Sequence, residues 1–127
     1  MNPFSVDAKD MLEADTDLTL VFGTDLFIGT EPIEPDDTVT LYDTYGGAPD
    51  PKFDYENPTL QVQIRNRSYA TGWGIGHTIK VSLHNRYEET WNSTRYLAIF
   101  GTSDVFFIGR DEHDRFLFTV NFRAQRV

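Results

Sequence analysis

The sequence predicts a single α+β domain in which strands outnumber helices. Its 127 residues suit one domain, expected over residues 1–127, and are too few for a second hydrophobic core. Hydrophobic residues make up 39% of the chain, and ten Phe, six Tyr and two Trp can fill one core. Alternating hydrophobic segments, typical of strands, recur along the chain, whereas one segment alone shows a clear helical spacing.

The helical spacing lies near the start of the sequence. Hydrophobic side chains stand at Phe4, Ala8, Met11 and Leu12, intervals that place them on one face of a helix. We therefore expect a short amphipathic helix over about residues 5–14.

Six short segments carry the alternation or the β-branched residues that are typical of strands. The strictest alternation covers residues 59–67, where Leu60, Val62 and Ile64 share one face. The other expected strands cover residues 25–29, 38–43, 95–100, 105–109 and 116–123. A charged turn at residues 111–114 is expected to join the last two strands as a hairpin.

Residues 69–87 fit two spacings. Their hydrophobic residues fall four apart, as on a helix, and also on alternate positions, as on a strand, which the spacing slightly favours. Gly72, Gly74 and Gly76 weaken both assignments. A phosphate-binding loop is a weak alternative, because the dinucleotide fingerprint requires a further glycine where His77 stands. A flexible lead-in to the next element is the simpler interpretation.

The longest irregular segment covers residues 44–58. It contains two adjacent glycines, three prolines and the aromatic residues Tyr45, Phe53 and Tyr55. A loop of this length in a compact domain is typically functional or disordered. Its aromatic residues indicate packing, either on the body of the protein or on a partner.

The formal net charge is −9, and the charge is unevenly distributed. Residues 1–56 contain 14 acids against two bases, hence −12, and residues 57–127 contain six acids against nine bases, hence +3. Such a chain lacks the basic footprint needed to coat nucleic acid or to bind an anionic membrane by charge. A solvated acidic face explains the asymmetry simply, and the alternative is a head-to-tail contact between acidic and basic parts of neighbouring subunits.

Candidate catalytic and ligand-binding residues are few. The chain has no cysteine, and His77, His84 and His113 show no metal-binding spacing. No nucleophile motif occurs, so we expect no metal, no cofactor and no enzymatic activity. We also expect no secretory leader and no membrane-spanning segment. Two further alternatives stay open, a carbohydrate-binding module using Trp73 and Trp91 and a small hydrolase built on His77 or His113.

Several short motifs follow one another along the chain. They are FGTDLFIG at 22–29, LYDT at 41–44, GG at 46–47, PDP at 49–51, YENP at 55–58, FIGRD at 107–111 and FTVNFR at 118–123. In this order they resemble the tail terminator, or minor capsid, proteins of long-tailed bacteriophages, over about residues 5–123. Tyr45 departs from the family pattern, in which the threonine and the two glycines are contiguous.

The resemblance implies a mixed or mostly antiparallel sheet packed against two helices, with the second helix after Tyr69. It also implies a structural virion protein that forms a ring, expected to be a hexamer, on the tail tube. Such a ring ends tube polymerisation and joins the head–neck connector, and DNA passes through its channel without specific binding. The protein would assemble in the host cytoplasm and remain in the virion at the tail–neck junction. A head-completion or stopper protein of the same assembly is the nearest alternative.

On this resemblance, the loop at residues 44–58 is the expected intersubunit or tube-facing contact. The residues expected to make it are Asp43, Tyr45, Gly46, Gly47, Asp50, Asp54, Tyr55 and Glu56. Arg65, Arg110 and Arg115 are the expected complementary bases on a neighbour. In the alternative, the glycines and prolines only shape a surface crossing, and Tyr55 packs on the core.

Overall fold

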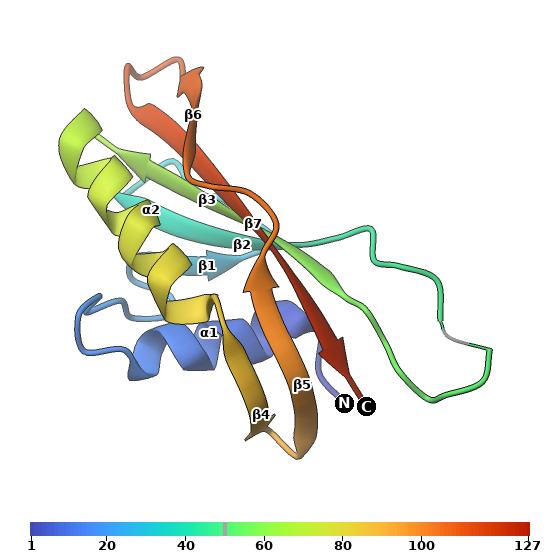
Figure 1. Ribbon diagram of the computed structural model, residues 1–127. Helices are drawn as coiled ribbons and strands as arrows, with labels where there is room; N and C mark the ends of the chain where they lie inside the picture. Colours follow the sequence, from blue (N-terminus) through green and yellow to red (C-terminus); the bar gives the residue numbers. More distant parts are fainter. Residues whose placement is uncertain (50) are drawn as a thin grey trace.

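Two helices pack against a seven-stranded sheet in the computed structural model, which describes residues 1–49 and 51–127 (Figure 1). The helices are α1 (Phe4–Ala14) and α2 (Tyr69–Leu83). The strands are β1 (Leu26–Ile28), β2 (Thr38–Thr44), β3 (Thr59–Asn66), β4 (Arg86–Trp91), β5 (Thr94–Gly101), β6 (Phe106–Arg110) and β7 (Phe116–Arg126).

The long strand β7 organises the sheet. The strand order is β1-β2-β3-β7-β5-β4, and β6 also pairs with β7. One edge of β7 pairs with β3, whereas its other edge pairs first with β6 and then with β5. The pair β1–β2 is parallel and the other pairs are antiparallel. The expected α+β class, with a mixed and mostly antiparallel sheet, is confirmed.

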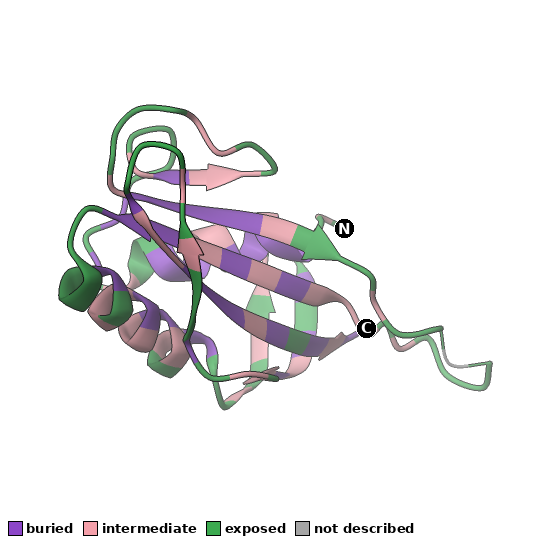
Figure 2. Ribbon diagram, turned by 90° about the horizontal axis from the view of Figure 1, so that it is seen from above, coloured by how far each residue is buried: buried purple, intermediate pink, exposed green. Residues whose placement is uncertain are grey.

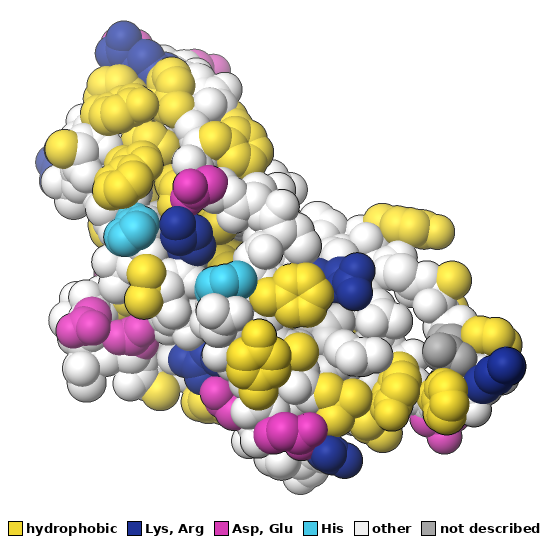
Figure 3. All heavy atoms as spheres, in the orientation of Figure 1, with side chains coloured by type: hydrophobic (Ala, Val, Ile, Leu, Met, Phe, Trp, Pro, Cys, Tyr) yellow, Lys and Arg dark blue, Asp and Glu magenta, His cyan; other side chains and the backbone are white. Residues whose placement is uncertain are grey.

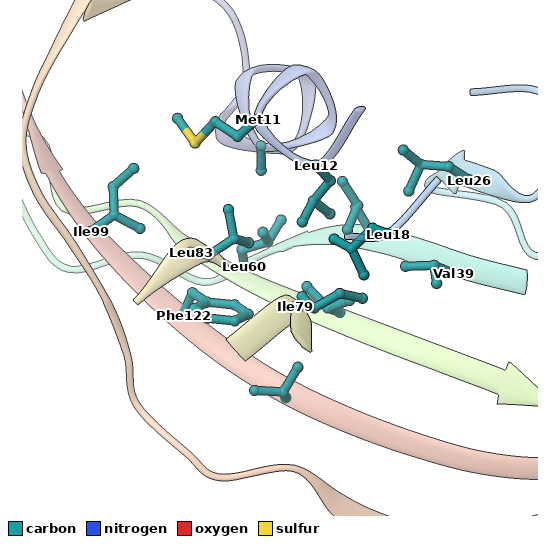
Figure 4. Packing of buried hydrophobic residues seen from close by; sticks show 14 of the residues in the cluster. Met11, Leu12, Leu18, Leu26, Val39, Leu60, Ile79, Leu83, Ile99 and Phe122 are labelled. Carbon is teal, nitrogen blue, oxygen red and sulfur yellow. The ribbon is translucent and has the colours of Figure 1, made fainter. Parts of the chain in front are cut away.

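The alternation in β3 produces the centre of the core. Leu60, Val62 and Ile64 are fully buried, in one cluster with residues of both helices. Figure 4 shows Leu12 of α1 and Leu83 of α2 close to Leu60 in this cluster. Burying one such side chain contributes about 1.5–3 kcal/mol, so the shared cluster holds the helices and the sheet together.

Residues Tyr69–Leu83 form a helix, so the strand that the spacing slightly favours is wrong, and the helix that the resemblance implies is confirmed. The buried residues of α2 are Gly72, Gly76, Ile79 and Leu83, which lie on one helical face. The glycines belong to this face. Once they are counted with the hydrophobic residues, the spacing is helical.

Two of these glycines let α2 lie close to the sheet. A Cβ at Gly72 would lie 2.8 Å from Cε2 of Phe118, and a Cβ at Gly76 would lie 2.8 Å from Cγ1 of Val105. A Cβ at Gly74 would meet no atom within 4 Å. Residues 72–76 lie within a helix that packs on the sheet, so they form neither a phosphate-binding loop nor a flexible lead-in.

The structure confirms the expected helix near residues 5–14 and all six expected strands. It adds β4, which is not among the expected elements. The residues of β4 are mostly polar, and each is exposed or half-buried; the strand pairs with β5 at the edge of the sheet. An edge strand with this exposure carries no hydrophobic alternation, which is the signal that the sequence prediction uses.

Candidate assembly surfaces

The segment between β2 and β3 forms an arm, defined as residues 45–58, that projects from one end of the sheet (Figure 1, Figure 2). Short hydrogen bonds close its base. The N–H of Gly47 donates to the carbonyl of Asn57 at 3.0 Å, and Oγ1 of Thr59 donates to the carbonyl of Tyr45 at 2.6 Å. The arm therefore continues the β2–β3 hairpin outward.

A glycine is required where the two sides of the arm meet. A Cβ at Gly46 would lie 2.8 Å from the carbonyl oxygen of Asn57 and 3.3 Å from Cα of Pro58. Both neighbours are backbone atoms, so a side chain at this position would push the two sides apart. The predicted role of Gly46 and Gly47 at a contact is not tested by this geometry, which gives Gly46 a structural role at the base.

Glu56 ties the returning side of the arm to β7. Its N–H donates to the carbonyl of Arg126 at 2.8 Å, and the N–H of Arg126 donates back at 2.9 Å. The side chains also pair, with Nη2 of Arg126 3.1 Å from Oε1 of Glu56. The arm is thus fixed at its base by backbone and side-chain contacts to the last strand.

Arg126 extends this connection into the core. Its Nη1 donates to Oη of Tyr96 at 3.1 Å and to the carbonyl of Asn2 at 2.9 Å, and the Tyr96 hydroxyl donates to the carboxylate of Asp7. Burial and the hydrogen bond to Asp7 raise the pKa of Tyr96, although Arg126 opposes them. The tyrosine therefore remains a neutral donor, and α1, β5, β7 and the arm share one polar network.

The arm exposes large aromatic side chains. Tyr45 is 94% exposed and Phe53 is 57% exposed. Phe53 and Tyr55 stack with their ring centroids 5.5 Å apart. Tyr55 packs on another arm residue, and the core cluster found in the described part of the chain does not include it. Exposed hydrophobic surface of this kind marks interaction sites in soluble proteins.

The three aspartates predicted at the contact have different places. Asp43 accepts hydrogen bonds from N and Oγ of Ser5 at 3.0 and 2.6 Å, so it satisfies a free donor in the first turn of α1. Asp54 is exposed on the arm. Asp50 lies outside the described residues. Asp43 therefore serves the fold, and Asp54 is a candidate contact residue.

Arg65 and Arg115, which are expected to contact a neighbouring subunit, are buried within the single chain. They are 2% and 4% exposed, and both hold the segment between β1 and β2, named here the clasp (residues 31–37). Arg65 donates to Oε1 of Glu31 at 2.9 Å and to the carbonyl of Pro35 at 2.6 Å. Arg115 donates to another clasp carbonyl. Their donors are used within the chain, and a contact of these two arginines with a neighbouring subunit stays a prediction.

Asp111 orients Arg115 from the hairpin turn. Its Oδ2 accepts from Nε of Arg115 at 2.8 Å, and its Oδ1 accepts from the N–H groups of Arg115 and His113 at 2.9 and 3.0 Å. Burial raises the pKa of Asp111, but these hydrogen bonds lower it more, so the pKa lies below its usual value. The ionised carboxylate thereby holds the arginine that holds the clasp.

Arg110 is the exposed member of the three predicted arginines. Its guanidinium carbon lies 5.1 Å from the ring centroid of Phe116, and Nη2 lies 3.6 Å from Oδ1 of Asp114. Ion pairs between exposed side chains contribute little to stability. Arg110 is therefore free to exchange this partner for one on another molecule.

Part of the acidic first half of the sequence is balanced within the same chain. Arg65, Arg67 and Arg115 pair with acids of the clasp, and Arg126 pairs with Glu56. In the described part of the chain, these pairs join four acids of residues 1–56 to four arginines of residues 57–127. The linear charge asymmetry is therefore reduced, and not removed, by contacts inside the subunit.

A second exposed hydrophobic surface lies over the start of α2 and over β6. It is named the α2–β6 patch and consists of Tyr69, Trp73, Phe106, Phe107 and Ile108, each 43–49% exposed. Figure 3 shows hydrophobic side chains gathered in this region. The rings of Tyr69 and Phe107 join the two elements, with centroids 5.3 Å apart. The sequence analysis missed this surface, and the run of three large hydrophobic residues in β6 is the signal that would have indicated it.

The histidines and tryptophans do not form a shared site. His77 stacks on Trp73 at 5.1 Å, whereas Nδ1 of His84 accepts the N–H of Gly101 at 2.9 Å. Trp91 is half-buried on β4, so the two tryptophans lie on different elements. Within residues 1–49 and 51–127, no group of three or more His, Asp or Glu side chains is placed to hold a metal ion.

Neither helix of the described chain is long and apolar enough to cross a membrane.

Comparison with known proteins places this chain in a family. A family model described as bacteriophage tail terminator protein matches residues 14–127. The fold is similar to that of a chain in the solved structure of the virion of a native gene transfer agent (GTA) particle. The TM-score is 0.75 at 15% identity, over 98% of this chain and 94% of that chain. Curated protein sequences give no match. The resemblance drawn from the motifs is confirmed, and the chain belongs to the bacteriophage tail terminator protein family.

Proposed function

We propose that this protein ends the tail tube as a closed ring, expected to be a hexamer, and presents the other face of the ring to the head–neck connector. It acts by shape and not by catalysis. The ring matches the end of the tube on one face and differs from a tube ring on the other, so no further tube subunit can add. The protein would assemble in the host cytoplasm and remain at the tail–neck junction.

The observation that carries this proposal is the presence of two unlike exposed surfaces on one subunit. The arm and the α2–β6 patch both expose large hydrophobic side chains, and they lie in different parts of the structure (Figure 1). Two different contact surfaces on one chain produce heterologous contacts, which close into a ring where the rotation between subunits permits. Membership of the tail terminator family supports the tail tube as the place of assembly.

The charge supports a channel through which DNA slides. The formal net charge is −9, and several of the bases are paired with acids of the same subunit. A protein binds DNA without sequence specificity by neutralising phosphates with free Lys and Arg side chains. We therefore infer that DNA passes this ring without being retained.

Tube polymerisation in vitro tests the proposal. Tail tube protein from the same virus is polymerised with and without this protein, and tube lengths are measured by negative-stain electron microscopy. We expect shorter tubes that carry one additional, distinct ring at one end. Tubes of unchanged length with bare ends would contradict the proposal.

The same preparation separates this function from that of a stopper protein. A stopper binds the isolated head–neck connector and leaves tube length unchanged, whereas a terminator binds the tube end before the connector arrives. Co-sedimentation with the tube alone and with the connector alone therefore distinguishes the two.

A further inference from the structure

We propose that the arm of one copy binds the α2–β6 patch of the next copy around the ring. This proposal rests on the ring described above and names the two surfaces that build it. The arm of one copy would cover the α2–β6 patch of the next, so both exposed hydrophobic surfaces would have a partner.

The hydrophobic parts of the two surfaces suit each other. The arm offers the exposed rings of Tyr45 and Phe53, the second stacked on Tyr55. The patch offers Trp73 on α2 and the aromatic side chains of β6. Aromatic side chains are enriched at the buried centres of protein interfaces, where they supply large contact areas.

The edge position of β6 adds a second means of binding. Of the strands in the described chain, β6 pairs with β7, which leaves the backbone groups along its other edge without a strand partner. An extended segment of another molecule can add to such an edge by main-chain hydrogen bonds. The described part of the arm contains no helix and bends at residues 51–53, and its two sides run outward from the sheet, so a side of the arm can lie along such an edge (Figure 1).

An exposed charge on each surface can pair with one on the other. Arg110 ends β6, and its exposed pair with Asp114, at 3.6 Å, is weak enough to be exchanged for an acid of another copy. Asp54 is an exposed acid on the arm. Lys80 of α2 pairs with Asp104 at 2.9 Å and is not needed for this contact. A contact between Arg110 and Asp54 at the rim would favour the arm-to-patch pairing over arm-to-arm or patch-to-patch contacts.

The geometry of the subunit prevents the arm from covering the patch of its own chain. β3 begins next to the arm and ends next to the start of α2, and it has eight residues. At a rise of about 3.3 Å per residue, the strand separates the two by about 25 Å. The arm also points away from α2 (Figure 1). The contact must therefore form between copies.

Disulfide cross-linking tests this contact directly, because the chain has no cysteine of its own. The first variant combines Phe53→Cys with Trp73→Cys, and the second combines Phe53→Cys with Ile108→Cys. None of the three side chains belongs to the buried core, so the variants are expected to fold. Each variant is assembled on tube ends and oxidised mildly. The products are then separated by denaturing electrophoresis without reductant.

We expect a ladder of covalent multiples of the 14.6 kDa chain, ending at the number of subunits in the ring, for at least one of the two variants. The matched control combines Phe53→Cys with Thr16→Cys, an exposed residue between α1 and β1, and should give no ladder. Rings that are visible by electron microscopy but give no ladder with either variant would overturn the proposed contact and leave the ring intact. Absence of any ring on the tube would overturn the proposed function, and the contact with it.

Discussion

Two acidic, proline-containing loops flank β2, and they make different contacts with the rest of the structure. The clasp (residues 31–37) precedes the strand and contains four acids and two prolines, and the arm (residues 45–58) follows it and contains three acids and three prolines. The clasp lies against the buried guanidinium groups of Arg65 and Arg115. The arm projects beyond the sheet and is tied at its base. Loops of similar composition therefore take opposite roles.

The difference comes from the side chains that neighbouring strands supply. If the clasp moved away, Arg65 would lose Glu31 and its carbonyl acceptors, and Arg115 would keep only Asp111, and breaking a buried ion pair is strongly unfavourable. The described arm has its contacts to β3 and β7 at its base, and its aromatic tip is exposed. The clasp is thus part of the folded body, whereas the arm is available to another molecule.

Removing Arg65, the β3 arginine that holds the clasp, has the largest expected effect on stability. Arg65→Met leaves the Glu31 carboxylate and several clasp carbonyls without their donor, so the free energy of unfolding should fall by about 3–5 kcal/mol. Urea denaturation followed by circular dichroism measures the change. The matched control is Arg67→Met, which removes an exposed arginine that pairs with the same loop and should cost less than about 1 kcal/mol. Equal effects of the two substitutions would refute the distinction between buried and exposed pairing.

The buried arginines also show what the sequence could not predict. Arg65 and the clasp residues that it binds are about 30 residues apart, and they meet because β2 and β3 pair in one particular register. Charge counts along the chain contain no information on that register. The exposure of the arm, in contrast, follows from its own glycines and prolines, and its limits could be predicted closely.

The same reasoning applies to the fold. Leu60, Val62 and Ile64 could be predicted as core residues because strand alternation is local. The buried face of α2 could not be predicted from the spacing of hydrophobic residues, because two of its buried positions are Gly72 and Gly76, which have no side chain. Their role depends on the sheet beneath the helix, which no local pattern describes.

The glycines of α2 provide the second test, because they fix the helix that carries the α2–β6 patch. Gly72→Ala brings a methyl group within 2.8 Å of the Phe118 ring and 3.0 Å of Asn66, so we expect a loss of about 1–3 kcal/mol in thermal or urea unfolding. Gly74→Ala is the matched control. It meets open space, and higher helix propensity should stabilise the protein by about 1 kcal/mol. A stabilising Gly72→Ala would show that helix and sheet are less closely packed than the structure indicates.

Alkaline pH probes the network at the base of the arm. The folded state raises the pKa of Tyr96 above the ordinary tyrosine value of about 10, so above about pH 10 the unfolded chain releases this proton more readily than the folded chain. Stability from this group is complete below pH 10 and should fall by about 1.4 kcal/mol per pH unit above it. Urea denaturation at a series of pH values measures the slope. Tyr96→Phe should reduce the slope, whereas Tyr87→Phe, at an exposed tyrosine, should leave it unchanged. An unchanged slope in Tyr96→Phe would assign the pH dependence to other groups.

A substitution at the tip of the arm should have the smallest effect on stability, and it tests directly whether the arm and the clasp have different roles. Phe53 is exposed, so Phe53→Ala should change the free energy of unfolding by no more than about 0.5 kcal/mol. The same substitution removes an aromatic anchor from the proposed contact, so the variant should fail to shorten tail tubes. Ile33→Ala is the matched control, because Ile33 is an exposed hydrophobic residue of the clasp. It should leave both stability and tube capping unchanged. If Ile33→Ala also abolished capping, both loops would be contact surfaces, and the arginines that hold the clasp would serve assembly as well as folding.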